Sequence, residues 1–289
     1  MPEGDTLHRT AARLRPALVG QAVVSLTAPR ATGRAPKADA TVTAVDAVGK
    51  HLVIRFDDGT LLRTHLRMIG SWHLYRAGER WQKPRHLARV VLDVGDWVAV
   101  CFSAPVVAFE RVGVDTGADA AGATVPASLG HLGPDLCVAG ADVDGAVRRL
   151  AAVGEPDRTI AEALLDQRVA AGIGNVYKSE VLWACRVDPF APVGQLDAAT
   201  RRTLLERAHR LLLANLGGGP RTTIPGPPGS LAVYGRARRP CPACGTPVQM
   251  RHHGEQHRST YWCPRCQPAA GSSAETPTPP DHDRDSLRP

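Results

Sequence analysis

Lysine, methionine and aromatic residues are scarce in this chain, and long apolar runs are missing from it. Without an apolar run of about 20 residues, the sequence offers no candidate for a membrane-spanning helix. The first 15 residues are rich in charged and polar side chains, which excludes the apolar stretch of a secretory signal. We therefore expect a cytoplasmic protein that has no membrane partner.

Only four of the 35 basic residues are lysines, namely Lys37, Lys50, Lys83 and Lys178. In a chain with so strong an arginine bias each retained lysine is informative, because a guanidinium holds its proton too tightly for acid–base chemistry. Basic residues outnumber acidic ones, 35 to 28, and the formal net charge is +7. This balance suits a polyanionic partner without requiring one.

The 289 residues exceed the usual size of one compact core, so we expect several domains. Apolar residues at helical spacing predict a helix over 3–18, which Gly20 ends. From 22 to 109 the pattern changes to short apolar runs broken by turn signals at 57–59 and 95–96. Hairpins of this kind predict an antiparallel β-sandwich.

The second half of the chain returns to a helical period. Apolar residues at this period flank a break at 172–174, and a further helix is predicted over 197–216. Residues 217–230 are rich in glycine and proline and connect to a cysteine-rich segment. We divide the chain into an N-terminal domain, a helical domain, a linker with the cysteine-rich segment, and a tail of disordered composition: 1–125, 126–222, 223–267 and 268–289.

Four of the seven cysteines form two pairs, and the pairs are 18 residues apart. Each pair occupies one tight turn, and the residues between the pairs are expected to form a hairpin, so that four thiolates surround one zinc ion. Zinc is favoured over two disulfides in a cytosolic protein. Four thiolates leave no open coordination position, so we expect a structural zinc and no catalytic metal or organic cofactor; the predicted ligands are Cys241, Cys244, Cys263 and Cys266.

Two further motifs are ambiguous when taken alone. Glycines at the helical break permit a tight turn, and the following Asn175 adds a donor for a phosphate, although the same residues could simply connect two helices. Pro2 would carry a secondary amine after removal of Met1, with the Glu3 carboxylate beside it. Such an amine can attack an electrophilic carbon, but by its position Pro2 is more often only a start-site residue.

Taken together, the motifs are specific because they occur in a characteristic order. In chain order they are residues 2–4, the pair Gly49-Lys50, residues 64–68, the run that begins at residues 165–167 and ends at residues 172–175, and the cysteine hairpin. In this order the chain resembles the formamidopyrimidine-DNA glycosylase and endonuclease VIII family over nearly its whole length, to Gln267. The resemblance implies an α+β multidomain fold: a β-sandwich with a leading helix, a helix-two-turn-helix domain, and a C-terminal β-hairpin zinc finger.

The resemblance also implies catalytic roles. Pro2 would attack C1′ of the damaged nucleotide, expel the base and leave a Schiff base. Glu3 would supply or shuttle the proton that opens the sugar ring. Lys50 would support glycosidic cleavage and β-elimination. Arg258, five residues before Cys263, would contact phosphate and assist δ-elimination.

Other positions would contact DNA. Because the target base must leave the stack, Arg67 and Met68 match the segment that fills the gap, with Ile69 beside them. Asn175 would hold a phosphate. The family commonly has a phosphate-binding arginine where this chain has His131, so this contact is expected to be weaker or to require a protonated imidazole.

The expected function is therefore that of a bifunctional DNA glycosylase and abasic-site lyase of base excision repair. The purine-specific branch carries an Asp-Pro-Arg-Arg-Phe-Gly motif, whereas this chain reads differently at 102–110, which favours the bacterial endonuclease VIII branch and oxidised pyrimidines. We expect a monomer associated with the nucleoid and bound to damaged DNA. The alternatives are a non-catalytic DNA-binding protein of the same fold, or a zinc-ribbon RNA-binding module, which would explain only the last quarter of the chain.

Overall fold

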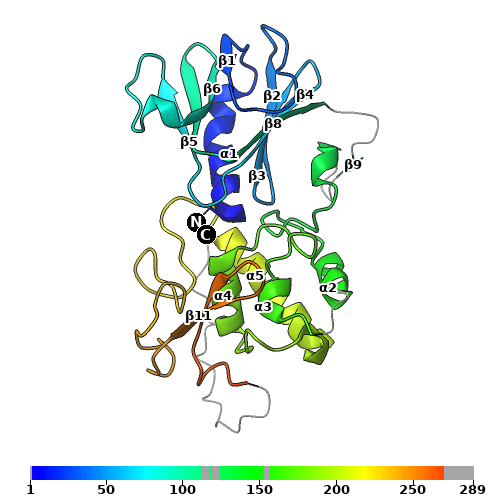
Figure 1. Cartoon of the computed structure of the whole chain (residues 1–289), viewed down its shortest axis with the longest axis vertical. Coiled ribbons are helices and arrows are strands. Elements are labelled where there is room, and N and C mark those ends of the chain that lie inside the picture. The colour runs from blue at the N-terminus through cyan, green and yellow to red at the C-terminus, as the bar shows by residue number, and fades with distance from the viewer. Residues whose placement is uncertain (1, 112–116, 119–123, 153–156, 270–289) are drawn as a thin grey trace.

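Two lobes joined at a narrow waist make up the molecule (Figure 1). The computed structural model describes residues 2–111, 117–118, 124–152 and 157–269. The tail predicted over 268–289 lies, from residue 270 onward, outside the described residues. No helix in the described part of the chain is both long and apolar enough to cross a membrane.

Helix α1 (Gly4–Leu18) confirms the predicted N-terminal helix. Its stripe of buried residues, which includes Leu7, Leu14 and Leu18, packs into the β-lobe. The backbone N–H of Glu3 donates to Thr6 Oγ1 over 3.4 Å at the start of the helix. The helix therefore joins the first residues of the chain firmly to the sandwich.

Two four-stranded antiparallel sheets form the β-sandwich among the described residues. One sheet has the order β2-β3-β4-β8, with β2 (Val42–Val48), β3 (His51–Phe56), β4 (Thr60–His65) and β8 (Val106–Arg111). The other has the order β1-β6-β7-β5, with β1 (Ser25–Thr27), β6 (Ala88–Asp93), β7 (Trp97–Phe102) and β5 (Ser71–Arg76). The turn signals at 57–59 and 95–96 join β3 to β4 and β6 to β7, as predicted.

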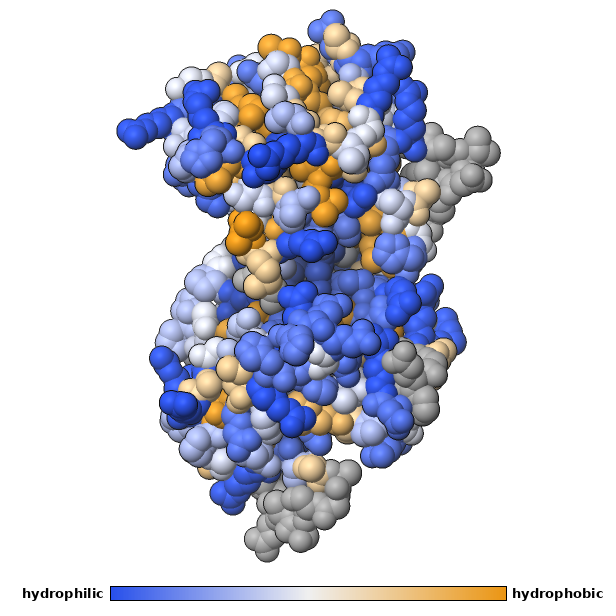
Figure 2. Space-filling model, viewed as in Figure 1, coloured by the Kyte–Doolittle hydropathy of each residue, from blue (hydrophilic) through white to orange (hydrophobic). Residues whose placement is uncertain are grey.

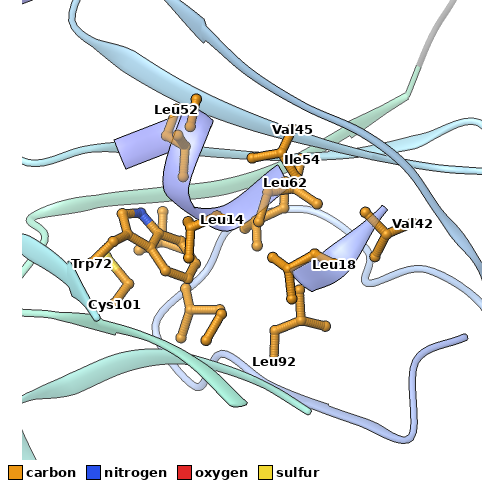
Figure 3. Packing of buried hydrophobic residues seen from close by; sticks show 14 of the residues in the cluster. Leu14, Leu18, Val42, Val45, Leu52, Ile54, Leu62, Trp72, Leu92 and Cys101 are labelled. Atoms are coloured by element: carbon orange, nitrogen blue, oxygen red, sulfur yellow. The ribbon is translucent and has the colours of Figure 1, made fainter. Parts of the chain in front are cut away.

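The core of the sandwich lies between the sheets and α1 (Figure 3). Leu14 of α1, Ile54 of one sheet and Leu92 of the other all lie in this core, and all three are fully buried. Each such side chain stabilises the fold by about 1.5–3 kcal/mol. Cys101 also lies in this core as a buried thiol.

The second lobe is helical and has its own core. It contains α2 (Val143–Ala151), α3 (Ile160–Ala163), α4 (Asn175–Ala184) and α5 (Ala198–Ala214). The prediction for 197–216 is confirmed, with the Asp197 side chain accepting from the Thr200 N–H at 2.6 Å. The helical period before the break yields only the short α3. After Leu164 the backbone bonds close over three residues, and the Asp166 carboxylate then accepts the backbone N–H of Arg168 at 2.9 Å, so the chain turns there.

Smaller elements complete the chain. The residues between the cysteine pairs form the predicted hairpin of β11 (Gln249–His253) and β12 (Arg258–Trp262), and β12 packs against α4. The described residues also include β9 (Gly117–Ala118), β10 (Thr124–Val125) and three 3₁₀ turns, η1 (Arg85–Leu87), η2 (Ala127–Leu129) and η3 (Val193–Gln195).

Candidate active site

Three connections between strands lie at the same end of the sandwich, the end nearest the helical lobe. They are the β2–β3 turn at 49–50, the β4–β5 loop at 66–70 and the β7–β8 turn at 103–105. The β2–β3 turn touches the helical lobe directly, since the Gly49 N–H donates to Asp135 Oδ2 at 2.7 Å. In Figure 2 the molecule narrows between the lobes, and hydrophilic residues cover much of the lower lobe beside the waist.

Glu3 reaches from the first lobe into the second. Its carboxylate is fully buried and accepts three backbone N–H groups at the start of α4, from Gly174, Val176 and Tyr177, at 3.0, 2.8 and 3.3 Å. A carboxylate is stabilised at a helix N-terminus by these donors and by the helix dipole. A Cβ at Gly174 would lie 2.2 Å from Glu3 Cδ, so only glycine fits there. Pro2, half-buried, is thereby held at the waist.

Arg221 supplies a positive charge that the sequence did not reveal. Its guanidinium pairs with both carboxylate oxygens of Asp5 and lies 4.0 Å from Glu3 Oε1. It also stacks over the Tyr177 ring at 4.8 Å. The Gly/Pro-rich segment that carries Arg221 therefore helps to hold two buried carboxylates at the start of α1.

Lys50 is half-buried in the same region. Burial lowers the pKa of its amine to about 8; the nearby Glu3 carboxylate opposes the shift and the Arg258 charge adds to it. A lysine whose pKa lies near the working pH is suited to proton transfer. The preceding Gly49 is fixed by Asp135, which also bonds to His8 Nε2 at 2.9 Å.

Asn175 and Lys178 join α4 to the cysteine-bearing hairpin. The Asn175 amide donates to the Ser259 carbonyl at 2.7 Å and to its hydroxyl at 3.0 Å. Lys178 Nζ donates to Asn175 Oδ1, the Ser259 carbonyl and Thr260 Oγ1 at 2.7, 3.1 and 2.9 Å. Burial lowers the Lys178 pKa to about 7, with Glu3 opposing and Arg258 reinforcing the shift. The predicted phosphate donor Asn175 thus bonds to protein groups here.

Arg258 begins β12, is half-buried, and donates to Gln256 Oε1 at 3.2 Å. Its charge acts on both Lys50 and Lys178. The structure therefore brings the predicted residues Glu3, Lys50, Asn175 and Arg258 together from four separate segments, with Pro2 adjacent to Glu3.

Arg67 and Met68 lie on the β4–β5 loop, which follows the strand that pairs with β3. Met68 and Ile69 expose 56% and 72% of their surface, and Arg67 is also exposed. Arg67 adopts a left-handed φ of 45°, and the Gly70 N–H closes the loop onto the Leu66 carbonyl at 2.9 Å. The tight loop presents its three tip side chains outward.

Two histidines behind this loop were missed by the sequence reasoning. The rings of His51 and His65 meet edge to face, with centroids 4.6 Å apart. Burial, together with the charges around each ring, lowers the pKa of His51 to about 3 and of His65 to about 4. The charges of Lys50, Arg67 and Arg63 act on His65, and Arg63 and the exposed His131 are among the groups that act on His51. Only pairing of β3 with β4 aligns His51 and His65, so no local pattern signals the pair.

The four predicted cysteine ligands converge at the base of the hairpin. Their sulfur atoms all lie within 4.8 Å of one another, with separations of 3.4, 3.5 and 3.8 Å among them. Four thiolates placed tetrahedrally around zinc at about 2.3 Å would be about 3.8 Å apart. The geometry therefore fits a four-thiolate zinc site, and the indole N–H of Trp183 donates to Cys241 Sγ at 3.4 Å.

Comparison with known families accounts for both lobes. Residues 1–105 match the formamidopyrimidine-DNA glycosylase N-terminal domain, and residues 132–224 match the formamidopyrimidine-DNA glycosylase H2TH domain. These matches cover more than half of the sequence. The chain therefore belongs to the formamidopyrimidine-DNA glycosylase family, as the order of its motifs predicted.

Relatives from several bacteria refine this placement. The chain is 39% identical over 278 residues to the DNA-(apurinic or apyrimidinic site) lyase Nei2 of Mycolicibacterium smegmatis, covering 93% of this chain and 100% of the relative. It is 40% identical over 281 residues to endonuclease 8 2 of Mycobacterium tuberculosis, covering 92% and 100%. Identity is lower, 32% over 299 residues covering 96% and 92%, with a formamidopyrimidine-DNA glycosylase of Symbiobacterium thermophilum. The endonuclease VIII-like resemblance is confirmed.

Solved structures confirm the fold. The MutM (Fpg) protein of Thermus thermophilus superposes with a TM-score of 0.72 at 29% identity, over 92% of this chain and 98% of that one. Lactococcus lactis Fpg, in complex with DNA that contains an abasic site, gives a TM-score of 0.72 at 22% identity, over 92% and 100%.

Proposed function

We propose that this protein is a bifunctional DNA glycosylase and abasic-site lyase of base excision repair that acts on oxidised bases. The observation that carries the proposal is the convergence of Glu3, beside Pro2, with Lys50 and Arg258 at the waist. Relatives that are about 40% identical over their full length and are named endonuclease 8 2 or lyase support the same activity. Damaged DNA is the proposed partner.

The proposed reaction begins after Met1 is removed. The Pro2 nitrogen uses its lone pair to form a bond to C1′ of the damaged nucleotide, and the glycosidic bond breaks with its electrons leaving on the base, which takes up a proton. The sugar ring then opens as its C1′–O bond breaks, and the ring oxygen receives a proton through Glu3. The product is an iminium ion between Pro2 and C1′.

The iminium ion makes strand cleavage possible because it acidifies the hydrogens on C2′. Loss of a C2′ proton to a base and departure of the 3′ phosphate complete β-elimination, and we assign Lys50 to support this step and glycosidic cleavage. Its lowered pKa suits that role, since both amine and ammonium forms are populated near pH 8. Arg258 is assigned to the phosphate and to any subsequent δ-elimination.

The remaining predicted residues are assigned to binding. The exposed tips of Arg67 and Met68 would enter the stack where the damaged base has left it. Asn175 would lie against a phosphate and donate its side-chain amide to it in place of Ser259, while the Glu3 carboxylate keeps the first N–H groups of α4. His131, exposed and close enough to act on His51, would add a weaker contact.

We also propose one structural zinc on the four cysteines, a monomeric protein and a cytoplasmic, nucleoid-associated location. The zinc would close the hairpin that carries Arg258 and would supply no reaction step, since four thiolates leave no open position. Gel filtration with light scattering tests the monomer.

Borohydride trapping tests the activity. With duplexes that carry defined lesions, reduction should crosslink the protein to DNA through Pro2, and an N-terminal extension that retains Met1 should abolish the crosslink. A crosslink that peptide mapping places on Lys50 would contradict the assignment, and absence of any crosslink would favour a non-catalytic binding protein.

Single-turnover rates on the same lesions test the substrate class. Because the chain lacks the purine-branch motif at 102–110, thymine glycol or dihydrouracil should be removed faster than 8-oxoguanine opposite cytosine. Faster removal of 8-oxoguanine would contradict the proposed preference for pyrimidines.

A further inference from the structure

A polar cluster that the proposed chemistry does not use lies next to the exposed β4–β5 loop. Lys83 Nζ lies 2.8 Å from Ser71 Oγ, and Ser71 Oγ lies 3.0 Å from His73 Nε2. His73 Nδ1 in turn lies 3.1 Å from the Tyr75 hydroxyl, which accepts from the Gln82 N–H at 3.1 Å. Lys83 is thus one end of an ordered chain of hydrogen bonds.

The direction of this chain follows from the donors. An ammonium can only donate, so Ser71 Oγ accepts from Lys83 and its own hydroxyl hydrogen is free to donate to His73 Nε2. Burial lowers the pKa of His73, and the charges of Lys83 and Arg13 lower it further, so the ring is neutral at neutral pH and able to accept. One contact orients the half-buried Lys83 amine and leaves its other N–H groups for a ligand.

The topology places this amine across the loop from the catalytic cluster. The loop at 66–70 leaves β4, whose sheet contains the Lys50 turn, and enters β5 of the other sheet at Ser71. Ser71 is paired with Phe102, at the end of β7, so Lys83 is tied to the same end of the sandwich as the loop. The loop therefore separates Lys50 on one sheet from Lys83 on the other.

A loop that enters the base stack has one DNA strand on each side of it. Because Lys50 is assigned to chemistry on the damaged strand, the Lys83 side would face the other strand. Two arginines add positive charge beside this sheet. Arg13 of α1 donates to the Trp72 carbonyl at 3.2 Å, and the Arg85 guanidinium of η1 lies 4.7 Å from the Trp81 ring centre. A phosphate is the anion that duplex DNA offers here.

We propose that Lys83, positioned by Ser71 and His73, binds a backbone phosphate of the undamaged strand opposite the lesion. This inference rests on the proposed function, because the loop must enter damaged duplex DNA. The contact reads no base; it fixes the position of the undamaged strand while the loop fills the gap.

Neutral methylphosphonate linkages test the contact directly. Each phosphate near a non-cleavable abasic analogue is replaced in turn, on either strand, and equilibrium binding is measured. Wild-type protein should lose roughly tenfold in affinity at one position of the undamaged strand, as expected for one charge-assisted hydrogen bond. Lys83→Gln should bind the unmodified duplex with the same loss and be insensitive at that one position. Its salt dependence, plotted as log affinity against log salt, should flatten by about one unit.

Lys37→Gln is the matched control. Lys37 is exposed, and its backbone N–H donates to Asp58 in the β3–β4 turn, at the far end of the sandwich from the loop. This variant should keep the wild-type pattern. Ser71→Ala should lose part of the affinity that Lys83→Gln loses, and it should be less sensitive than wild type to methylphosphonate replacement at the same phosphate.

Wild-type affinity of Lys83→Gln for the unmodified duplex would overturn the inference. The inference would also be wrong if methylphosphonate replacement at each undamaged-strand phosphate weakened binding of Lys83→Gln as much as it weakens wild-type binding. The same holds if Lys83→Gln became insensitive to a replacement on the damaged strand. Thermal unfolding of each variant verifies that it is folded. Borohydride trapping is run in parallel, so that a failure of the proposed chemistry is seen separately from a failure of the Lys83 contact.

Discussion

The groups at the waist and the tip of the β4–β5 loop differ in burial and bonding. Glu3 and Asn175 are 0% and 4% exposed, and their side-chain oxygens and nitrogens have several partners. Met68 and Ile69 are 56% and 72% exposed. Groups that take part in chemistry gain from a fixed position, because alignment reached during folding need not be reached again during reaction. Side chains that must enter a base stack gain from having no competing contacts.

Disrupting the zinc hairpin should have the largest effect on the groups at the waist. Cys244→Ala should remove the zinc, unfold the hairpin and withdraw Ser259 and Thr260 from Asn175 and Lys178, while the sandwich stays folded. DNA affinity should fall on the order of a hundredfold or more, since several contacts are lost together. Metal analysis, circular dichroism and equilibrium binding measure the three effects.

A second cysteine supplies the control for that experiment. Cys185 is half-buried and lies outside the four-thiolate cluster, so Cys185→Ala should keep about one zinc per chain and bind DNA normally. Finding no zinc in wild-type protein purified without chelator would contradict the metal assignment.

The next largest loss of DNA affinity is expected from a change at Asn175, which bonds to Ser259 in the free protein and is proposed to contact a phosphate. Asn175→Ala should weaken binding to an abasic analogue by about 1–3 kcal/mol, by a similar factor for every lesion, because a phosphate contact carries no base information. Its salt slope should change little, since a neutral donor releases no counterion, whereas Arg258→Ala should flatten the slope by about one unit. If Asn175→Ala binds the abasic analogue as tightly as wild type, residues 172–175 only connect two helices and the phosphate assignment is wrong.

Because the loop is exposed, a change at Met68 should weaken DNA binding less than the changes above and should leave stability unchanged. Met68→Ala should weaken duplex binding by about 1–2 kcal/mol, because the apolar surface it buries in the stack is lost. The free energy of unfolding should stay within about 0.5 kcal/mol of wild type, since the side chain is exposed in the free protein. Met250→Ala, on β11 and 39% exposed, is the matched control. Lower stability with unchanged binding would make Met68 a structural residue.

The smallest effect expected is a shift in a pH profile. If the ammonium form of Lys50 donates a proton during base excision, the single-turnover rate should fall as pH rises through about 8. Arg258 lowers this pKa, so its removal should raise the pKa and move the falling limb to higher pH by up to about one unit. Arg265→Ala should leave the limb in place. A limb that moves to lower pH in Arg258→Ala would exclude Lys50 as the titrating group.

Local patterns were enough to predict elements whose partners lie nearby in the chain. Helix α1, the turns at 57–59 and 95–96 and the cysteine hairpin all follow from spacing, because helical stripes and turns depend on residues a few positions apart. The order of motifs was also enough to identify the family. Local spacing did not give the length of α3, which ends after one turn where the Asp166 carboxylate accepts the backbone N–H of Arg168.

Only the tertiary structure decided how the site is assembled. Glu3 meets the start of α4 across 171 residues of sequence, and Arg221 pairs with Asp5 across 216. The bonds of Lys178 to β12 and the position of Lys83 behind the loop likewise depend on how separate segments pack. A charged residue carries the same local signature whether it is solvated or buried against a distant partner. The pKa values and contacts that define its chemistry arise only when folding removes water and brings the partner close.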